Sequence, residues 1–192
     1  MKRNQKLLIG LFLLLATAAC RHNYTPKPRG FFRIEFPEKS YHPLPAGYPY
    51  QFDVPGYATV VPDTDALTEP YWINVSVPQY KAEIHLSYKK IEGNLGIFTE
   101  ESRELAYKHT IKADGIEEQL FINPKEKVFG TIYKIKGNAA SPMQFYLTDS
   151  VRHFLRGSFY IREVPNIDSL KPIIDFLEPD LVRMIESTKW VR

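Results

Sequence analysis

Proline spacing is the feature that most limits how this chain folds. Of its 15 prolines, ten fall between residues 26 and 78, at positions 26, 28, 37, 43, 45, 49, 55, 62, 70 and 78. Proline has no backbone N–H and its ring clashes with the preceding helical turn, so this part of the chain is not expected to be helical. Short segments rich in aromatic and β-branched residues lie between the prolines and predict strands. These segments are 31–36, 50–54, 57–61 and 71–77.

Alternation of apolar and polar side chains supports the strands. It is clear in residues 32–36 and again in residues 82–88. A period of two indicates a sheet with one face against the core and the other toward solvent. Further strands are predicted at residues 118–122, 128–136, 143–148 and 154–161.

Two helices are predicted among these strands. The first covers residues 99–113, with Thr99 as its N-cap and two glutamates in its first turn, where acidic groups favour the helix dipole. The second is a C-terminal amphipathic helix capped by Asp168, in which Pro179 should produce a kink or a split. Its apolar residues recur at steps of three and four: Leu170, Ile173, Ile174, Leu177, Leu181, Met184 and Ile185.

These patterns predict the fold class. With 44% hydrophobic and 14% aromatic residues the chain has enough apolar surface for a core. Strands predominate and helical crossovers are few, which favours an α+β fold over a parallel one. We expect a single domain over residues 31–192, with an antiparallel or mixed sheet flanked by helices.

The N-terminus has the pattern of an export signal over residues 1–19. Lys2, Arg3 and Lys6 precede an apolar run that ends in small residues. The run is too short for a permanent membrane span, which needs about 20 apolar residues. Without these three cations, 22 basic residues balance 22 acidic ones. The neutral body gives no reason to expect a nucleic-acid partner.

Cys20, the one cysteine, directly follows this signal. The placement resembles a lipobox, in which the cysteine receives fatty acyl chains such as palmitate, although Thr17 stands where leucine is usual. The alternative is ordinary secretion with cleavage near Ala18. If Cys20 is acylated, two or more chains anchor the protein stably. Residues 20–30 then form a proline-containing tether, with no acidic cluster to direct the protein to the cell surface, so we expect a body facing the periplasm.

Catalytic signatures are missing from the sequence. There is no nucleophile-elbow or phosphate-loop motif. The histidines at 22, 42, 85, 109 and 153 lack the close spacing of metal ligands. We therefore predict no catalytic residue, no metal site and no cofactor.

Two groups of residues remain as possible contacts for a ligand or partner. His153 and Arg156 lie near Asp149, a mixture found in anion sites, although a strand would place His153 and Arg156 on opposite faces. Tyr71 and Trp72 form either an exposed aromatic contact or part of the core.

Several segments together resemble the gliding motility lipoprotein family GldD of Bacteroidetes. They are 23–30 (NYTPKPRG), 71–74 (YWIN), 107–109 (YKH), 137–141 (GNAAS), 153–157 (HFLRG), 165–166 (PN) and 168–170 (DSL), together with Cys20. The resemblance implies a part in gliding motility and in type IX protein secretion. It brings no reaction and no catalytic residues.

Two functions follow as hypotheses. The first is a non-catalytic assembly or stability factor, anchored to a membrane by lipid and bound to other envelope proteins of the gliding and type IX secretion apparatus. The alternative is a periplasmic enzyme or small-ligand-binding protein with a site around Asp149, His153 and Arg156.

Overall fold

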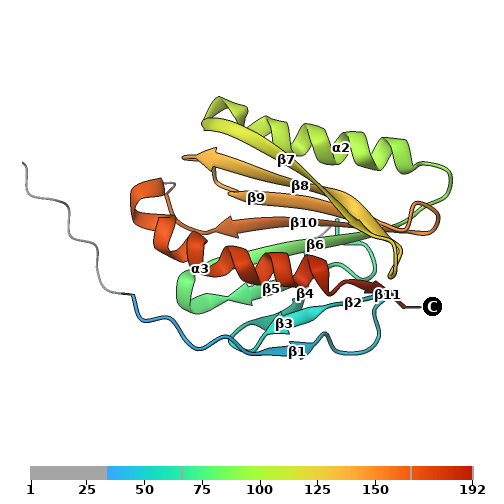
Figure 1. The fold of residues 1–192 in the computed structure, drawn as a ribbon, viewed down its shortest axis with the longest axis horizontal. Coiled ribbons are helices and arrows are strands. Elements are labelled where there is room, and N and C mark those ends of the chain that lie inside the picture. Colours follow the sequence, from blue (N-terminus) through green and yellow to red (C-terminus); the bar gives the residue numbers. More distant parts are fainter. Residues whose placement is uncertain (1–33, 66, 165, 192) are drawn as a thin grey trace, which may run out of the picture. The chain divides into compact units, whose positions relative to one another are not determined.

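Seven antiparallel strands form the main sheet, in the order β4-β5-β6-β10-β9-β8-β7 (Figure 1). The structure is a computed structural model that describes residues 34–191 other than 66 and 165. The signal 1–19, Cys20 and the tether 20–30 therefore lie outside the described residues. The strands are β4 (Thr59–Pro62), β5 (Ile73–Val77), β6 (Ala82–Lys90), β7 (Ala113–Asn123), β8 (Val128–Gly137), β9 (Met143–Thr148) and β10 (His153–Ile161).

Two small strand pairs and two α-helices complete the described chain. The pairs are both antiparallel and join β1 (Tyr41–Pro43) to β3 (Asp53–Pro55) and β2 (Tyr50–Gln51) to β11 (Lys189–Trp190). The helices are α2 (Leu95–Tyr107) and α3 (Ile167–Glu186), with short 3-10 turns η1 (Pro78–Tyr80) and η2 (Lys108–Ile111). The predicted α+β class is confirmed, and the sheet is antiparallel.

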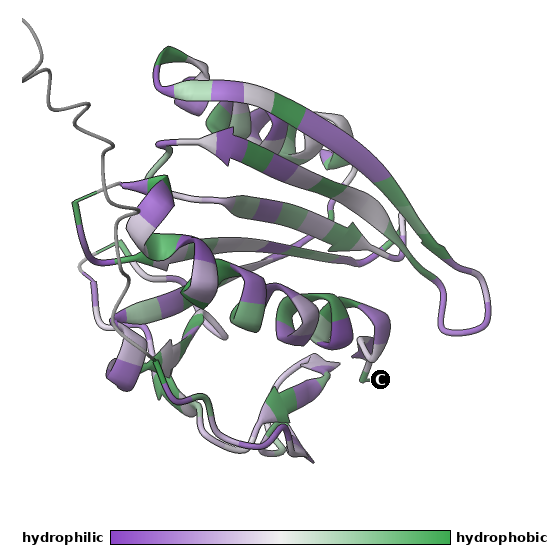
Figure 2. Cartoon of the chain, turned by 60° about the vertical axis from the view of Figure 1, so that its left-hand side comes forward, coloured by the Kyte–Doolittle hydropathy of each residue, from purple (hydrophilic) through white to green (hydrophobic). Residues whose placement is uncertain are grey.

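The core of the protein lies on one face of the main sheet. This face carries the large apolar side chains of the core, including Leu86, Phe145 and Phe159. Gly157 lies opposite Phe145 on this face, and a Cβ there would come within 2.2 Å of the phenyl ring. Figure 2 shows the β7–β8 hairpin extending beyond the other strands, with a hydrophilic turn.

Helix α3 covers the apolar face. Its residues Leu177, Leu181, Met184 and Ile185 are all buried and belong to the same core as the sheet. Each buried side chain of this size contributes about 1.5–3 kcal/mol of transfer free energy. Figure 1 and Figure 2 both show α3 between the main sheet and the β1–β3 pair. The predicted amphipathic helix is therefore present and docked as expected.

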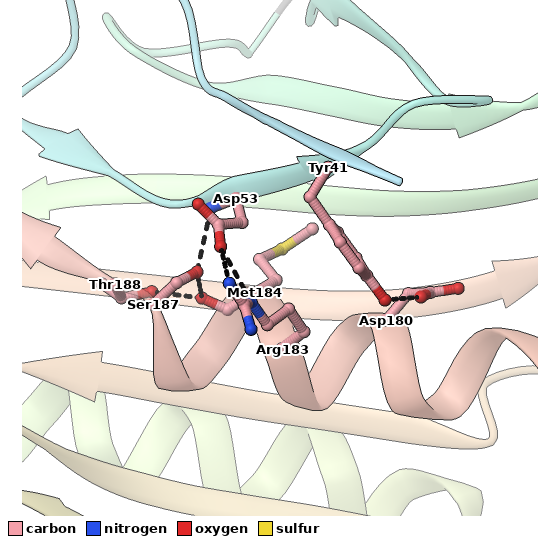
Figure 3. Close-up of polar contacts among 7 residues, drawn as sticks. All are labelled: Tyr41, Asp53, Asp180, Arg183, Met184, Ser187 and Thr188. Carbon is pink, nitrogen blue, oxygen red and sulfur yellow. Dashed lines mark hydrogen bonds and ion pairs between the residues drawn. The ribbon is translucent and has the colours of Figure 1, made fainter. Parts of the chain in front are cut away.

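A buried carboxylate connects α3 to the proline-rich first half of the chain. Asp180 is only 2% exposed. It accepts a hydrogen bond from the Tyr41 hydroxyl at 2.5 Å (Figure 3). It also accepts hydrogen bonds from Lys39 Nζ at 2.7 Å and from the Tyr57 hydroxyl. Burial, followed by the bond to Asp180, raises the pKa of Tyr41 to about 12, so its hydroxyl remains a donor. These contacts satisfy a charge that would otherwise be costly to bury.

A second polar contact lies one turn further along α3. Arg183 pairs with Asp53 of β3 at 2.7 Å, and the backbone N–H of Asp53 donates to Ser187 Oγ at 2.9 Å (Figure 3). The small β1–β3 pair is thus held against α3 by directed bonds as well as by apolar contact.

Several predicted boundaries are wrong. Helix α2 begins after Asn94, not Thr99, and β7 already begins at Ala113. The C-terminal helix follows Asn166 as N-cap in place of Asp168, and Pro179 does not split it. The described part of the first predicted strand, residues 34–36, is not in a strand. Within the described residues, no helix has the length and apolar character needed to cross a bilayer.

Neutralising Asp180 should weaken the fold. Asp180→Asn removes the buried charge that binds Lys39 and the two tyrosines, and we expect a loss of about 3 kcal/mol in the free energy of unfolding. Urea unfolding of the full chain measures this. Asp175→Asn is the matched control, because Asp175 pairs with Lys171 on the exposed side of the same helix and should cost less than about 0.5 kcal/mol. Equal losses in the two variants would contradict the assigned role of Asp180.

Candidate functional site

Four of the five residues singled out in the sequence lie at one end of the sheet. They are Tyr71, Trp72, Asp149 and His153. Because Ile73 pairs with Leu86 in the antiparallel β5–β6 ladder, the two residues before β5 lie beside Tyr88. His153 begins β10 and lies beside the same tyrosine. We call the side chains of Tyr71, Trp72, Tyr88, His153 and Trp190 the aromatic end.

Direct contacts hold the aromatic end together. The indole N–H of Trp72 donates to the Tyr88 carbonyl at 2.9 Å, and the Tyr88 hydroxyl lies 2.8 Å from His153 Nδ1. Tyr71 meets Tyr88 edge to face, with ring centroids 5.8 Å apart. Aromatic pairs in this geometry are favourable beyond the area that they bury.

Trp190 of β11 is a member that the sequence reasoning missed. Its ring stacks on His153 with centroids 5.0 Å apart, and its indole N–H donates to the Lys127 carbonyl at 3.0 Å. No local pattern marks Trp190, because it lies in a two-residue strand after α3. Only the β2–β11 pairing, which is distant in sequence, places it here.

Tyr71 combines exposure with an uncommon backbone conformation. Its φ is +70°, and 47% of the residue is exposed. A bulky residue with positive φ is strained, and such strain concentrates at functional sites. The Tyr50 hydroxyl donates to the Tyr71 carbonyl at 2.6 Å and so fixes this conformation. Trp72, in contrast, packs against the core.

Asp149 organises the turn between β9 and β10. Its Oδ1 accepts from the backbone N–H groups of Val151, Arg152 and His153, at 2.9, 2.7 and 2.9 Å. Burial opposes ionisation, but these three donors outweigh it and lower the pKa of Asp149. The carboxylate is therefore charged and engaged in holding the turn.

Arg156 does not join this group. It follows His153 by three positions in β10 and so faces the other side of the sheet. Its Nη2 donates to Gln144 Oε1 at 2.7 Å on that side. The structure thus brings Asp149 and His153 together but separates Arg156 from them, and the proposed three-residue ligand site is not formed.

A family model described as gliding motility lipoprotein GldD matches residues 21–190. The chain belongs to this family. It is therefore a membrane-anchored lipoprotein of the cell envelope with a role in gliding motility. The expected resemblance is confirmed over almost the whole sequence.

The solved structures that match this lipoprotein in backbone fold include one determined in solution. It is the solution structure of cyanobacterial PsbP (CyanoP) from Synechocystis sp. PCC 6803, with a TM-score of 0.49 and 9% identity. The similarity covers 87% of this chain and 100% of that one. The comparison with curated proteins gave no match.

Acid should destabilise the aromatic end of the lipoprotein. Burial is the largest influence on His153 and lowers its pKa below the ordinary 6.5, although Asp149 opposes this. Below about pH 6.5 His153 is protonated in the unfolded chain but still neutral in the folded chain. The free energy of unfolding therefore falls as the pH falls toward the folded-state pKa. His153→Gln should cost about 1 kcal/mol at neutral pH, through the lost Tyr88 hydrogen bond. It should also reduce this pH dependence, and the remainder comes from His109, whose pKa burial lowers as well.

Unfolding midpoints of the full chain between about pH 7.5 and pH 5 test this expectation. His42→Gln, at an exposed position on β1, is the matched control and should keep the wild-type slope. An unchanged slope in His153→Gln would show that His153 does not cause the acid sensitivity.

Proposed function

We propose that this lipoprotein is a non-catalytic assembly or stability factor of the envelope machinery for gliding motility and type IX secretion. The observation that carries the proposal is the family match over residues 21–190. The absence of catalytic motifs from the sequence and the engagement of Asp149 in turn formation agree with a binding role.

The proposed anchor is acylated Cys20, which lies outside the described residues. A leader that ends in small residues directly before this cysteine supports it, as does the lipoprotein family. With two or more chains the anchor is stable. The body then faces the periplasm on a short proline-containing tether.

The proposed contact for a partner is the aromatic end. Tyrosine and tryptophan are enriched among residues that dominate the energy of protein interfaces, because a rigid aromatic ring buries a large area with little loss of conformational entropy. Tyr71 is exposed and its backbone is already fixed by Tyr50. The expected partner is another envelope protein of the same machinery.

Loss of the protein should affect secretion as well as movement. In cells that lack the chain we expect no gliding, a strong loss of type IX cargo from the medium and lower levels of other lipoproteins of the apparatus. The wild-type chain should restore all three, whereas Cys20→Ser should not, because it cannot be acylated. Normal secretion together with an unaltered set of apparatus proteins in the deletion strain would refute the proposal.

Replacing Tyr71 should separate partner binding from folding. Tyr71→Asn removes the ring but suits positive φ, so the unfolding free energy should change by less than about 1 kcal/mol. Recovery of crosslinked apparatus proteins from membranes should fall about tenfold, as expected for a dominant interface aromatic.

Tyr107→Asn provides the matched control for this pull-down. Tyr107 is also exposed, but it lies on α2 and donates to Glu118 of β7, away from the aromatic end. Its replacement should leave partner recovery unchanged. Equal recovery with Tyr71→Asn and with wild type would exclude Tyr71 from the contact.

A further inference from the structure

The face of the sheet beneath α2 is polar around Arg156. Arg156 is half-buried in β10, and its one hydrogen bond to a described residue is that from Nη2 to Gln144 Oε1. No carboxylate of the described chain forms an ion pair with it. Burial opposes its charge and lowers its pKa, although the guanidinium remains protonated at any ordinary pH. A desolvated cation of this kind normally has an anionic partner.

Two further donors next to Arg156 have no partner among the described residues. Gln144 is 2% exposed and its Nε2 is unpaired; Ser158 is 1% exposed and its Oγ is unpaired. Gln144 and Ser158 are direct neighbours across the β9–β10 ladder, and Ser158 follows Arg156 by two positions on the same face. A guanidinium, an amide N–H and a hydroxyl therefore lie together on one face, all able to donate.

The surroundings supply no compensating negative charge. The one carboxylate of β6, Glu83, is paired with Arg162. His109 of η2 has a pKa lowered by burial and then by the positive charge of Arg156, and is therefore neutral. The register partner of Arg156 on β6 is Ser87, an uncharged residue.

Of these three residues Arg156 alone is partly accessible to solvent, whereas Gln144 and Ser158 are buried. Helix α2 packs over β9 and β10 through the buried Ser102 and Ala106. Ser87 and Tyr160, on the same face, are only half-buried. The exposed part of the Arg156 side chain is therefore where an anion would first meet this group.

We propose that Arg156, Gln144 and Ser158 form a binding site for an oxyanion group, and that a carboxylate is the class that fits. A carboxylate carries one negative charge, which matches the single cation, and its two oxygens accept from a guanidinium in a planar, bidentate manner. The remaining oxygen lone pairs can accept from the amide and the hydroxyl. The site is separate from the aromatic end and does not depend on the proposed function.

Thermal unfolding of the full-length chain in nonionic detergent tests the site. Sodium acetate is the probe, sodium phosphate the comparison and sodium chloride at matched ionic strength the reference. Acetate should raise the wild-type Tm above the chloride value in a saturable manner, because a ligand that binds only the folded state stabilises it. The rise should be larger than with phosphate.

Arg156→Met should abolish the acetate-specific rise, and Ser158→Ala, a milder change, should reduce it. Arg152→Met is the matched control, since it removes the same charge from an exposed position in the β9–β10 turn. It should respond to acetate as wild type does. If Arg156→Met does not fold, the Arg156 Nε–H resonance of the wild-type chain, labelled with ¹⁵N-arginine, should shift on acetate addition.

Three results would overturn the proposal. They are a wild-type Tm that acetate leaves at the chloride value, an equal rise in wild type and Arg156→Met, and a larger rise with phosphate than with acetate. Because these readings use purified protein, they are independent of partner recovery in cells. A failed anion site thus leaves the assembly function standing, and the reverse also holds.

Discussion

The structure depends on covering one apolar face of a seven-stranded antiparallel sheet. Helix α3 provides that cover, and it comes from the last part of the chain, whereas the strands that enclose α3 from the other side come from the proline-rich first part. Apolar contact alone does not fix how a helix is rotated on a sheet, because it is non-directional. The bonds from Lys39, Tyr41 and Tyr57 to Asp180 supply that direction. The position of Trp190, just beyond α3, follows from the same docking.

The opposite face of the sheet, beneath α2, includes buried polar side chains. Ser102 and Ala106 are small, and the sheet surface beneath α2 holds the buried Gln144 and Ser158 and the half-buried Arg156 beside apolar side chains such as Phe154. Buried polar groups of this kind are costly when unsatisfied, so their presence calls for a specific reason. An anionic ligand at Arg156 supplies one. The face beneath α3 thus carries the main core, and the proposed site lies on the other face.

The sequence predicts the strands better than the helix boundaries, for physical reasons. Period-two alternation is local, so β6, β8, β9 and β10 lie close to where the pattern placed them. Thr99 failed as a cap because α2 begins at Leu95, where packing of Phe98 on Phe154 outweighs the weak helix propensity of Gly96. Pro179 did not split α3 because burial of Leu177 and Leu181 on either side outweighs the lost hydrogen bond. At the aromatic end, Tyr71 and His153 were found by residue type. Trp190 was not, since only long-range pairing brings it there.

The start of the described chain and the aromatic end lie at opposite ends of β5 and β6. Phe36, near the start of the described residues, stacks on Phe176 and contacts Tyr80 of η1, at the turn between β5 and β6. Tyr88 lies near the far end of β6, eight residues on, or roughly 25 Å at about 3.3 Å per residue. Tyr71, which packs against Tyr88, therefore lies at the end of the sheet remote from where the described chain begins.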